Sequence, residues 1–237
     1  MRASAADWLK RRRQAALSWP PVDLSNRVGA VSDQGPRPLC VAFALSAAHE
    51  SLAHDDESAF VPAPEPLWWW MSGQRLAGPD GAFLADGGSA LGAVGQCGAA
   101  VWPYDPGLGH STQDPPPAAG PAPWRRCGLA MVDLAHDGVE ERLEATLAAG
   151  SPVVVVIEVT DGFEFPDEDG FVPVPDLRAP SGGYHAVVVE GAWTDPVRGR
   201  VLLVRNSWGE GWGAGGFGLF PVEYLVAHAV QAAVVGP

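Results

Sequence analysis

Residues 33–52 read Asp-Gln-Gly-Pro-Arg-Pro-Leu-Cys-Val-Ala-Phe-Ala-Leu-Ser-Ala-Ala-His-Glu-Ser-Leu, and this stretch decides the fold of the first half of the chain. Strong helix formers fill the run from Leu39 onward, and a turn containing Pro36 and Pro38 ends whatever precedes it. The stretch therefore predicts a helix with Cys40 at or near its N-terminus. Unpaired backbone N–H groups and the helix dipole stabilise a thiolate there, so we expect a lowered pKa for Cys40.

Cys40 is a candidate nucleophile only together with other groups, because a lone cysteine is more often buried and inert. A thiolate nucleophile needs a base that pairs with it as imidazolium, a group that orients this base, and donors for the oxyanion of the tetrahedral intermediate. Gln34 lies six positions before the cysteine, on a turn that folds its amide back toward the thiol. His185 opens one predicted strand and Asn206 ends another, although either residue alone is more often structural.

Around these residues the sequence resembles the papain and cathepsin family, the C1 cysteine peptidases. In that family a Gln-Gly turn leads to the nucleophile and then to Ala-Phe, as it does in residues 34–43 here. Residues 206–213, Asn-Ser-Trp-Gly-Glu-Gly-Trp-Gly, resemble the family's Asn-Ser-Trp-Gly segment, and residues 185–187 resemble its His-Ala-Val strand. The 145 positions from Cys40 to His185 fall within the ~130–150 of papain-like enzymes, and the 166 positions to Asn206 lie slightly beyond that range.

The resemblance implies a catalytic role for each of these residues. The Cys40 thiolate attacks the scissile carbonyl while Gln34 and the Cys40 backbone N–H hold the oxyanion. His185 protonates the leaving amine and Asn206 orients its ring, while Trp208 shields that contact from water.

The resemblance also implies where substrate binds. Residues 86–89, Asp-Gly-Gly-Ser, resemble the glycine turn of the family whose backbone pairs with substrate, which implies substrate-binding roles for Gly87 and Gly88. Ala186 is expected to line the main specificity pocket. Residues 102–105, Trp-Pro-Tyr-Asp, resemble a Tyr-Pro-Tyr landmark, and the likeness extends from about Val22 to Tyr224.

The sequence departs from the family at the turn before the nucleophile. Where the family usually has Cys-Gly-Ser-Cys-Trp, residues 37–41 read Arg-Pro-Leu-Cys-Val. Arg37 stands at the usual bridging cysteine and Ala85 at its expected partner, so both halves of that disulfide are missing, as a chain in reducing conditions requires. Val41 replaces the aromatic residue after the nucleophile, which is expected to loosen packing but removes no proton-transfer group.

The pattern along the chain predicts an α+β, papain-like two-lobe fold with the active site in the cleft between the lobes. A helical N-terminal lobe is expected over about 30–115, with helical pieces at 67–71 and 89–94 and a turn at Gly87 and Gly88. Short β-branched and aromatic runs predict an antiparallel β-rich lobe over about 120–237, in which a helix capped by Asp137 and Glu140 precedes the run that starts at Val153. Residues 1–19 are expected to be an N-terminal extension to a peptidase domain at 20–237, with a short helix over 5–17.

Composition limits the classes of partner. A formal net charge of -13 repels phosphate backbones and anionic lipid, so neither nucleic acid nor a membrane is an expected partner. Three cysteines without C-x-x-C spacing favour neither a disulfide framework nor a zinc site, and we expect no metal and no cofactor. With no signal-peptide pattern and no long apolar run, the expected location is cytoplasmic.

The expected function is a cysteine peptidase that hydrolyses peptide bonds in a specific protein substrate through a thioester on Cys40. Two alternatives stay open at this stage. One is a catalytically impaired peptide-binding module, motivated by Val41 and the altered turn, and the other is a transpeptidase or deamidase that transfers the acyl group. A regulatory protein partner is a further expectation, because fewer than 25 residues precede the catalytic core in this sequence.

Overall fold

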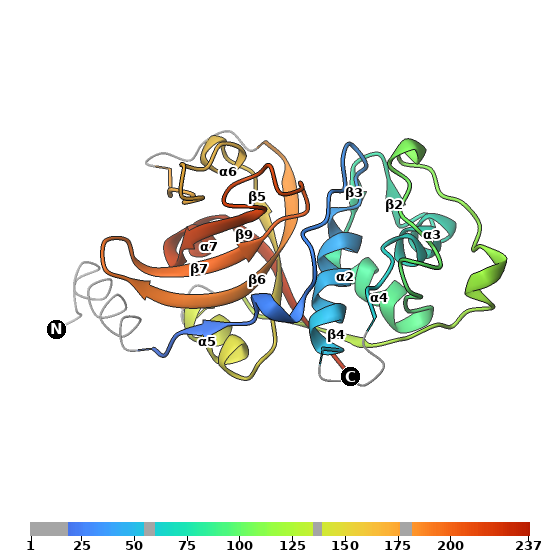
Figure 1. The fold of residues 1–237 in the computed structure, drawn as a ribbon, viewed down its shortest axis with the longest axis horizontal. Coiled ribbons are helices and arrows are strands. Elements are labelled where there is room, and N and C mark those ends of the chain that lie inside the picture. The colour runs from blue at the N-terminus through green and yellow to red at the C-terminus, as the bar shows by residue number, and fades with distance from the viewer. Residues whose placement is uncertain (1–18, 55–59, 135–138, 176–181) are drawn as a thin grey trace.

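The computed structural model describes residues 19–54, 60–134, 139–175 and 182–237, and these residues form two lobes that meet along one helix (Figure 1). The predicted helix over 5–17 and the capping residue Asp137 lie outside the described residues. One lobe contains the helices α2 (Cys40–Leu52), α3 (Glu65–Gly73) and α4 (Leu84–Ala93), with the hairpin β2 (Ala77–Gly78) and β3 (Gly81–Ala82). The other lobe is built on an antiparallel sheet, so the expected α+β two-lobe fold is confirmed.

The sheet has the strand order β4-β9-β5-β6-β7-β8, and the short strand β1 pairs with β6. Two helices, α5 and α7, accompany the sheet, and the turn of helix α6 precedes the segment that leads to β6. The bounds are β1 (Val22–Asp23), β4 (Gly128–Met131), α5 (Val139–Ala148), β5 (Val153–Glu158), α6 (Asp161–Glu164), β6 (Tyr184–Asp195), β7 (Gly199–Arg205), β8 (Phe217–Pro221), α7 (Val222–His228) and β9 (Ala229–Gly236), with 3-10 turns at Ser25–Arg27, Pro106–Leu108 and Pro117–Ala119.

The run of valines in β5 has both of its faces buried. Val153 and Val155 pack into the core of the sheet lobe, whereas Val154 and Val156 pack against the helical lobe. Side chains alternate between the two faces of a strand, so a sheet that is covered on both faces requires such a continuous apolar run. The same alternation in β6 directs Ala186 and Val188 toward the helical lobe.

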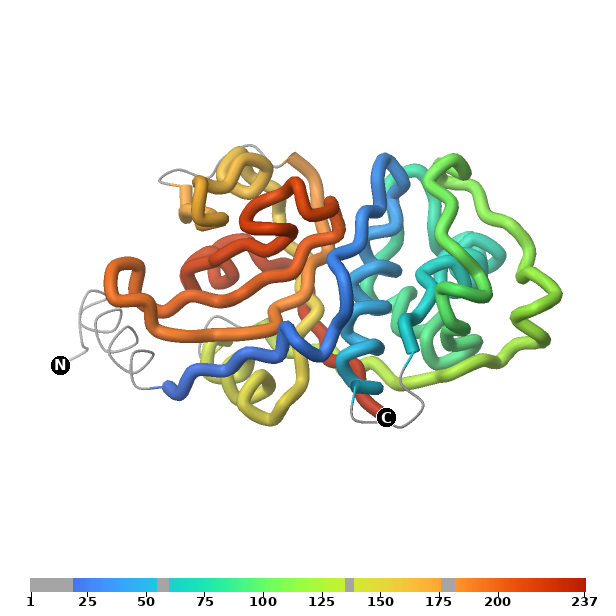
Figure 2. Tube along the Cα trace, viewed as in Figure 1, coloured from blue at the N-terminus to red at the C-terminus, as the bar shows by residue number. Residues whose placement is uncertain are grey.

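Helix α2 lies at the junction of the two lobes (Figures 1 and 2). Its residues Val41, Ala42, Phe43, Ala44, Leu45, Ser46, Ala48, His49 and Ser51 are all buried. A helix that is apolar and buried around most of its circumference belongs to the interior of a protein. Packing of α2 against β6 is therefore what joins the two lobes at the position of Cys40.

The first described residues belong to the sheet lobe although they precede α2 in the chain. Strand β1 pairs with β6, with Val22 opposite Ala192. The buried Arg205 side chain donates to the carbonyls of Gly29 at 3.1 Å and Ser25 at 3.3 Å. The chain therefore crosses from the sheet lobe to the helical lobe just before the Gln34 turn, which brings that turn to the junction.

The prediction of a turn at Gly87 and Gly88 is wrong. Both glycines lie inside α4, which begins at Leu84 rather than at the predicted residue 89, and the Gly87 N–H donates to the carbonyl of Phe83. A Cβ atom on Gly87 would lie 2.6 Å from Leu45 Cδ1 and 2.7 Å from Val41 Cγ1. Glycine occurs here because α4 approaches α2 closely, and it does not form a turn that is free to pair with a substrate.

Within the described residues, no helix combines the length and the apolar composition that are needed to cross a bilayer.

Two glycines of α4 test this packing argument. A Cβ atom on Gly92 would meet nothing within 4 Å, so Gly92→Ala is expected to raise the free energy of unfolding by about 0.5–1 kcal/mol. Gly87→Ala forces a methyl group against Val41 and Leu45 and is expected to lower it by about 1–3 kcal/mol. Urea unfolding of both variants measures the difference, and a Gly87→Ala variant as stable as Gly92→Ala would contradict the close approach of α4 to α2.

Candidate active site

Cys40 is the first residue of α2 and its side chain is partly exposed. Backbone hydrogen bonds to Ala186, Val41 and Cys40 itself lower the pKa of the thiol, but burial raises it by more, and the net pKa lies above the ordinary value. The expected lowering at the helix N-terminus is therefore wrong in direction, because desolvation of the thiol outweighs the effect of the helix terminus. The bond to Ala186 brings the sulfur next to the residue that follows His185 in β6.

His185 and Asn206 form a buried hydrogen-bonded pair on neighbouring segments of the sheet lobe. His185 Nε2 lies 2.7 Å from Asn206 Oδ1, and this oxygen also accepts from the Ser207 backbone N–H at 2.7 Å. Because Oδ1 can only accept, the proton of the neutral ring resides on Nε2, which leaves Nδ1 with the lone pair of a base. Burial lowers the pKa of His185 to about 4, while the bond to Asn206 raises it by a smaller amount.

The rings around His185 exclude water from the bond to Asn206. The Trp208 ring centroid lies 4.7 Å from that of His185, and Phe163, from α6, lies 5.6 Å from His185 and 5.0 Å from Trp208. Trp208 thus lies where the sequence predicted a shield. Phe163 was not predicted, because it belongs to none of the motifs that the sequence offered.

Gln34 is clamped on both sides of its amide group. The Ser207 hydroxyl donates to Gln34 Oε1 at 2.6 Å, and Gln34 Nε2 donates to the carbonyl of Arg37 at 2.8 Å. The backbone N–H of Gln34 donates to the carbonyl of Ser207 at 2.8 Å, so the turn is also held to the segment that carries Asn206. The amide therefore has a fixed orientation, with one N–H of Nε2 used by Arg37 and the second left for an oxyanion.

Gly87 and Gly88 lie within α4, so their predicted role as substrate-binding backbone stays a prediction without the turn that motivated it. A different glycine lies near the nucleophile turn: a Cβ atom on Gly81, in β3, would be 3.5 Å from the carbonyl oxygen of Pro38. Gly81 has a φ of +95°, which L side chains rarely adopt. In the sequence Gly81 follows Asp80, and an Asp-Gly pair is a hairpin signal that could have indicated this position.

Ala186 is buried and lines a cavity of about 130 Å³ between the lobes. The other walls of this cavity include Phe43 and Ala44 of α2, Pro62 and Asn206. Ala186 therefore contacts both the Cys40 sulfur, through its backbone, and the space between the lobes. Its predicted part in substrate specificity stays a prediction.

Comparison with known proteins agrees with this arrangement. The sequence model of the papain family cysteine proteases matches residues 129–228, which include His185 and Asn206. The crystal structure of xylellain, a cysteine protease from Xylella fastidiosa, is similar with a TM-score of 0.73 and 27% identity, covering 94% of this chain and 88% of that one. The chain is therefore similar to papain family cysteine proteases in both sequence and fold.

Two further comparisons give lower sequence identity. A digestive procathepsin L 3 of Tenebrio molitor larval midgut has a TM-score of 0.72 and 21% identity over 94% of this chain and 72% of that one, a likeness of fold. An uncharacterized peptidase C1-like protein of Acanthamoeba polyphaga mimivirus is 26% identical over 204 residues, which is 81% of this chain. The match spans 64% of the length of that viral relative.

The protonation of His185 can be tested without a substrate. In Cys40→Ala the ring has no thiolate to pair with, and we expect it to titrate near the value of about 4 that its burial produces. Histidine in an unfolded chain titrates near ~6.5, so the unfolded state binds the proton first. The stability that His185 contributes is therefore present above about pH 6.5 and is lost as the pH falls to about 4.

Ring-proton NMR of Cys40→Ala measures this pKa directly. Urea unfolding of Cys40→Ala and of Cys40→Ala/His185→Gln at several pH values isolates the contribution of His185 to the free energy of unfolding. A ring pKa at or above ~6.5 would contradict the buried, neutral state of this imidazole.

Proposed function

We propose that this papain-family chain is an active cysteine peptidase, which hydrolyses peptide bonds in a protein or peptide substrate through a thioester on Cys40. The observation that carries the proposal is the pairing of an oriented base with an oriented oxyanion donor. The His185–Asn206 pair and the Gln34 clamp are held by the same segment, since Ser207 bonds to both Asn206 and Gln34. Such preorganisation of acid, base and oxyanion donors is what accelerates acyl transfer.

The first half of the reaction uses these groups as follows. The Cys40 proton moves to His185 Nδ1, the sulfur bonds to the carbonyl carbon, and the electron pair of the carbonyl moves onto its oxygen. The second N–H of Gln34 Nε2 and the Cys40 backbone N–H stabilise this oxyanion. When the carbonyl re-forms, the C–N bond breaks, the leaving amine takes the proton from Nδ1, and a thioester remains on Cys40.

In the second half, water adds to the thioester carbon while His185 Nδ1 takes a proton from the water. The same donors stabilise the second oxyanion. Collapse breaks the C–S bond, releases a carboxylic acid and returns the proton to the sulfur. The hydrogen bond that His185 Nε2 donates to Asn206 Oδ1 keeps Nδ1 directed at the thiol in both halves.

The impaired binding module is the less favoured alternative, because its two motivating features do not disturb the groups that react. Val41 is buried against the backbone of Gly87, so the smaller side chain is compensated by close packing of α4. The altered turn still leaves Gln34 Nε2 bonded to the Arg37 carbonyl. A transferase remains the second candidate, because water and an amine can attack the same thioester.

The substrate, a regulatory protein partner and the compartment belong to the proposal as well. We infer specificity for one protein from the papain-like architecture, in which both lobes contribute to substrate binding. Restraint of the activity by a protein partner is a separate part of the proposal. A reducing compartment such as the cytoplasm is supported by three free cysteines, Cys40, Cys97 and Cys127.

Substitution of the nucleophile tests the proposal. Cys40→Ala is expected to lower peptide hydrolysis more than ~10³-fold, because no other group replaces a catalytic nucleophile. Cys97→Ser, which changes another free and partly exposed cysteine, should leave the rate within about twofold. An epoxysuccinyl probe should label wild type and Cys97→Ser but not Cys40→Ala.

The substrate can be found by comparing protein N-termini in cells that express wild type or Cys40→Ala. Product analysis with an added amine distinguishes hydrolysis from transfer, because a transferase yields the amide and a hydrolase yields the acid. If the wild-type protein neither reacts with the probe nor cleaves any substrate, the proposed peptidase function is wrong.

The dependence of kcat/KM on pH follows from the two buried groups. The active pair shares one proton, and burial disfavours both a second proton on His185 and a lone thiolate on Cys40. We therefore expect kcat/KM to fall on the acid side only below pH ~6.5, toward the His185 value of about 4. On the alkaline side we expect kcat/KM to fall only above pH ~8.5, the ordinary value for a thiol. A fall in kcat/KM for a peptide substrate with its midpoint between pH ~6.5 and pH ~8.5 would contradict this expectation.

A further inference from the structure

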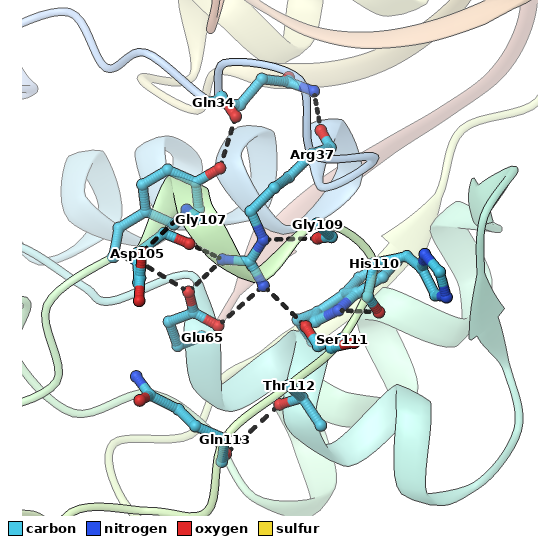
Figure 3. Close-up of polar contacts among 12 residues, drawn as sticks. Gln34, Arg37, Glu65, Asp105, Gly107, Gly109, His110, Ser111, Thr112 and Gln113 are labelled. Atoms are coloured by element: carbon cyan, nitrogen blue, oxygen red, sulfur yellow. Dashed lines mark hydrogen bonds and ion pairs between the residues drawn. The ribbon is translucent and has the colours of Figure 1, made fainter.

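Arg37 has a fully buried side chain, with 1% of the residue exposed, three positions before the nucleophile. Its guanidinium forms a buried pair with Glu65, through Nη1 to Oε1 and through Nη2 to Oε2 at 3.3 Å. Its other donors reach three carbonyls, those of Gly109 at 2.7 Å, Asp105 at 2.9 Å and Ser111 at 3.0 Å (Figure 3). The five N–H groups of the guanidinium therefore all have acceptors, which is the condition for burying this charge.

Glu65 is placed to hold this charge. It is the first residue of α3, with none of its surface exposed, so the N-terminus of the helix and the guanidinium both stabilise the carboxylate. The three carbonyls belong to the irregular segment 105–111, which runs past this pair (Figure 3). One side chain thus ties the nucleophile turn to α3 and to a long connection.

The backbone of Arg37 reaches the catalytic machinery. Its carbonyl oxygen is the acceptor that holds Gln34 Nε2, at 2.8 Å. Tyr104 closes the same arrangement: its hydroxyl donates to the Gln34 carbonyl, and the Arg37 guanidinium carbon lies 4.9 Å from its ring centroid. Two of the hydrogen bonds that hold Gln34 therefore involve Arg37, directly or through Tyr104. The Arg37 carbonyl accepts the first, and the second comes from Tyr104, whose ring lies against the Arg37 guanidinium.

We propose that Arg37 is a positioning residue for the oxyanion donor, and that its buried pair with Glu65 serves as a non-covalent tether of the nucleophile turn. This inference rests on the proposed peptidase function. Anchoring of the guanidinium fixes the Arg37 carbonyl, and the carbonyl fixes which way the second N–H of Gln34 points. Arg37 stands where the resemblance placed one half of a disulfide, and Cys40, Cys97 and Cys127, which all lie in the described ranges, are free.

This positioning role predicts effects that differ between two reactions of the same sulfur. A peptide aldehyde adds to the Cys40 sulfur, and its oxygen takes the place of the oxyanion, so its affinity depends on Gln34. Alkylation by iodoacetamide displaces iodide from a saturated carbon and needs no oxyanion donor. Loss of the tether should weaken the first reaction and leave the second unchanged.

The experiment compares wild type with Arg37→Met/Glu65→Leu, an apolar pair of similar size that leaves no unpaired buried charge. We expect aldehyde affinity and kcat to fall about 10- to 100-fold, toward the effect of Gln34→Ala, while KM and the alkylation rate stay within about twofold. Arg198→Met removes an arginine from an exposed pair with Asp167 and Asp169 and serves as the matched control with wild-type values. Circular dichroism verifies the fold of each variant.

Two single variants carry the same comparison if the double variant unfolds. Arg37→Lys keeps the charge but has three donors in place of five, and Glu65→Gln keeps the size but not the carboxylate; each should show a smaller loss of aldehyde affinity with normal alkylation. Unchanged aldehyde affinity in the folded variants, or an equal loss of both reactions, would overturn the positioning role. A wild-type protein that is alkylated at Cys40 but binds no aldehyde would instead overturn the proposed function, and this inference with it.

Discussion

The proposed catalytic groups come from two lobes, so the candidate site exists only while α2 packs against β6. Cys40 begins α2, whereas His185 lies in β6 and Asn206 follows β7. The backbone bond between the Cys40 sulfur and Ala186 spans this junction. The apolar contacts that maintain it include Leu45 and Val188, which belong to one continuous core shared by both lobes. Burial of that core is therefore a condition for catalysis as well as for stability.

Buried arginine–glutamate pairs hold irregular segments in both lobes. Arg37 pairs with Glu65 and binds carbonyls of segment 105–111, Arg200 pairs with Glu144 and binds carbonyls of residues 19–20, and Arg205 pairs with Glu190 and binds carbonyls of residues 25–29. Such pairs contribute little net stability relative to apolar packing, but loss of one partner typically costs about 3–5 kcal/mol. They satisfy loop carbonyls that no strand or helix satisfies. The described cysteines are all free, so the loops are fixed by polar contacts rather than by cystines.

The candidate site residues could be selected from the sequence because each lies in a short motif of recognisable type. Ser207 links Gln34 to the His185–Asn206 pair, and Trp208 lies beside the His185 ring, while the catalytic roles of these residues stay predictions. The glycine pair was misplaced because Gly-Gly signals a turn locally, whereas here it permits α4 to approach Val41 and Leu45, a fact of tertiary packing.

Two other features depend on the folded environment. A helix N-terminus alone predicts a lowered thiol pKa, but the degree of burial that reverses this shift is set by the docking of both lobes. The pairing of Arg37 with Glu65 joins residues 28 positions apart, and no periodic pattern or spacing in the sequence indicates it. Contacts between irregular segments are the part of the site that only the structure reveals.

The most direct test of the central claim is a crystal structure of the protein with a peptide aldehyde. The account predicts a bond from the Cys40 sulfur to the aldehyde carbon, with the former carbonyl oxygen within hydrogen-bond distance of Gln34 Nε2 and the Cys40 backbone N–H. His185 should keep its bond from Nε2 to Asn206, with Nδ1 facing the adduct. An adduct whose oxygen points away from Gln34, or a sulfur that the aldehyde does not reach, would contradict the account.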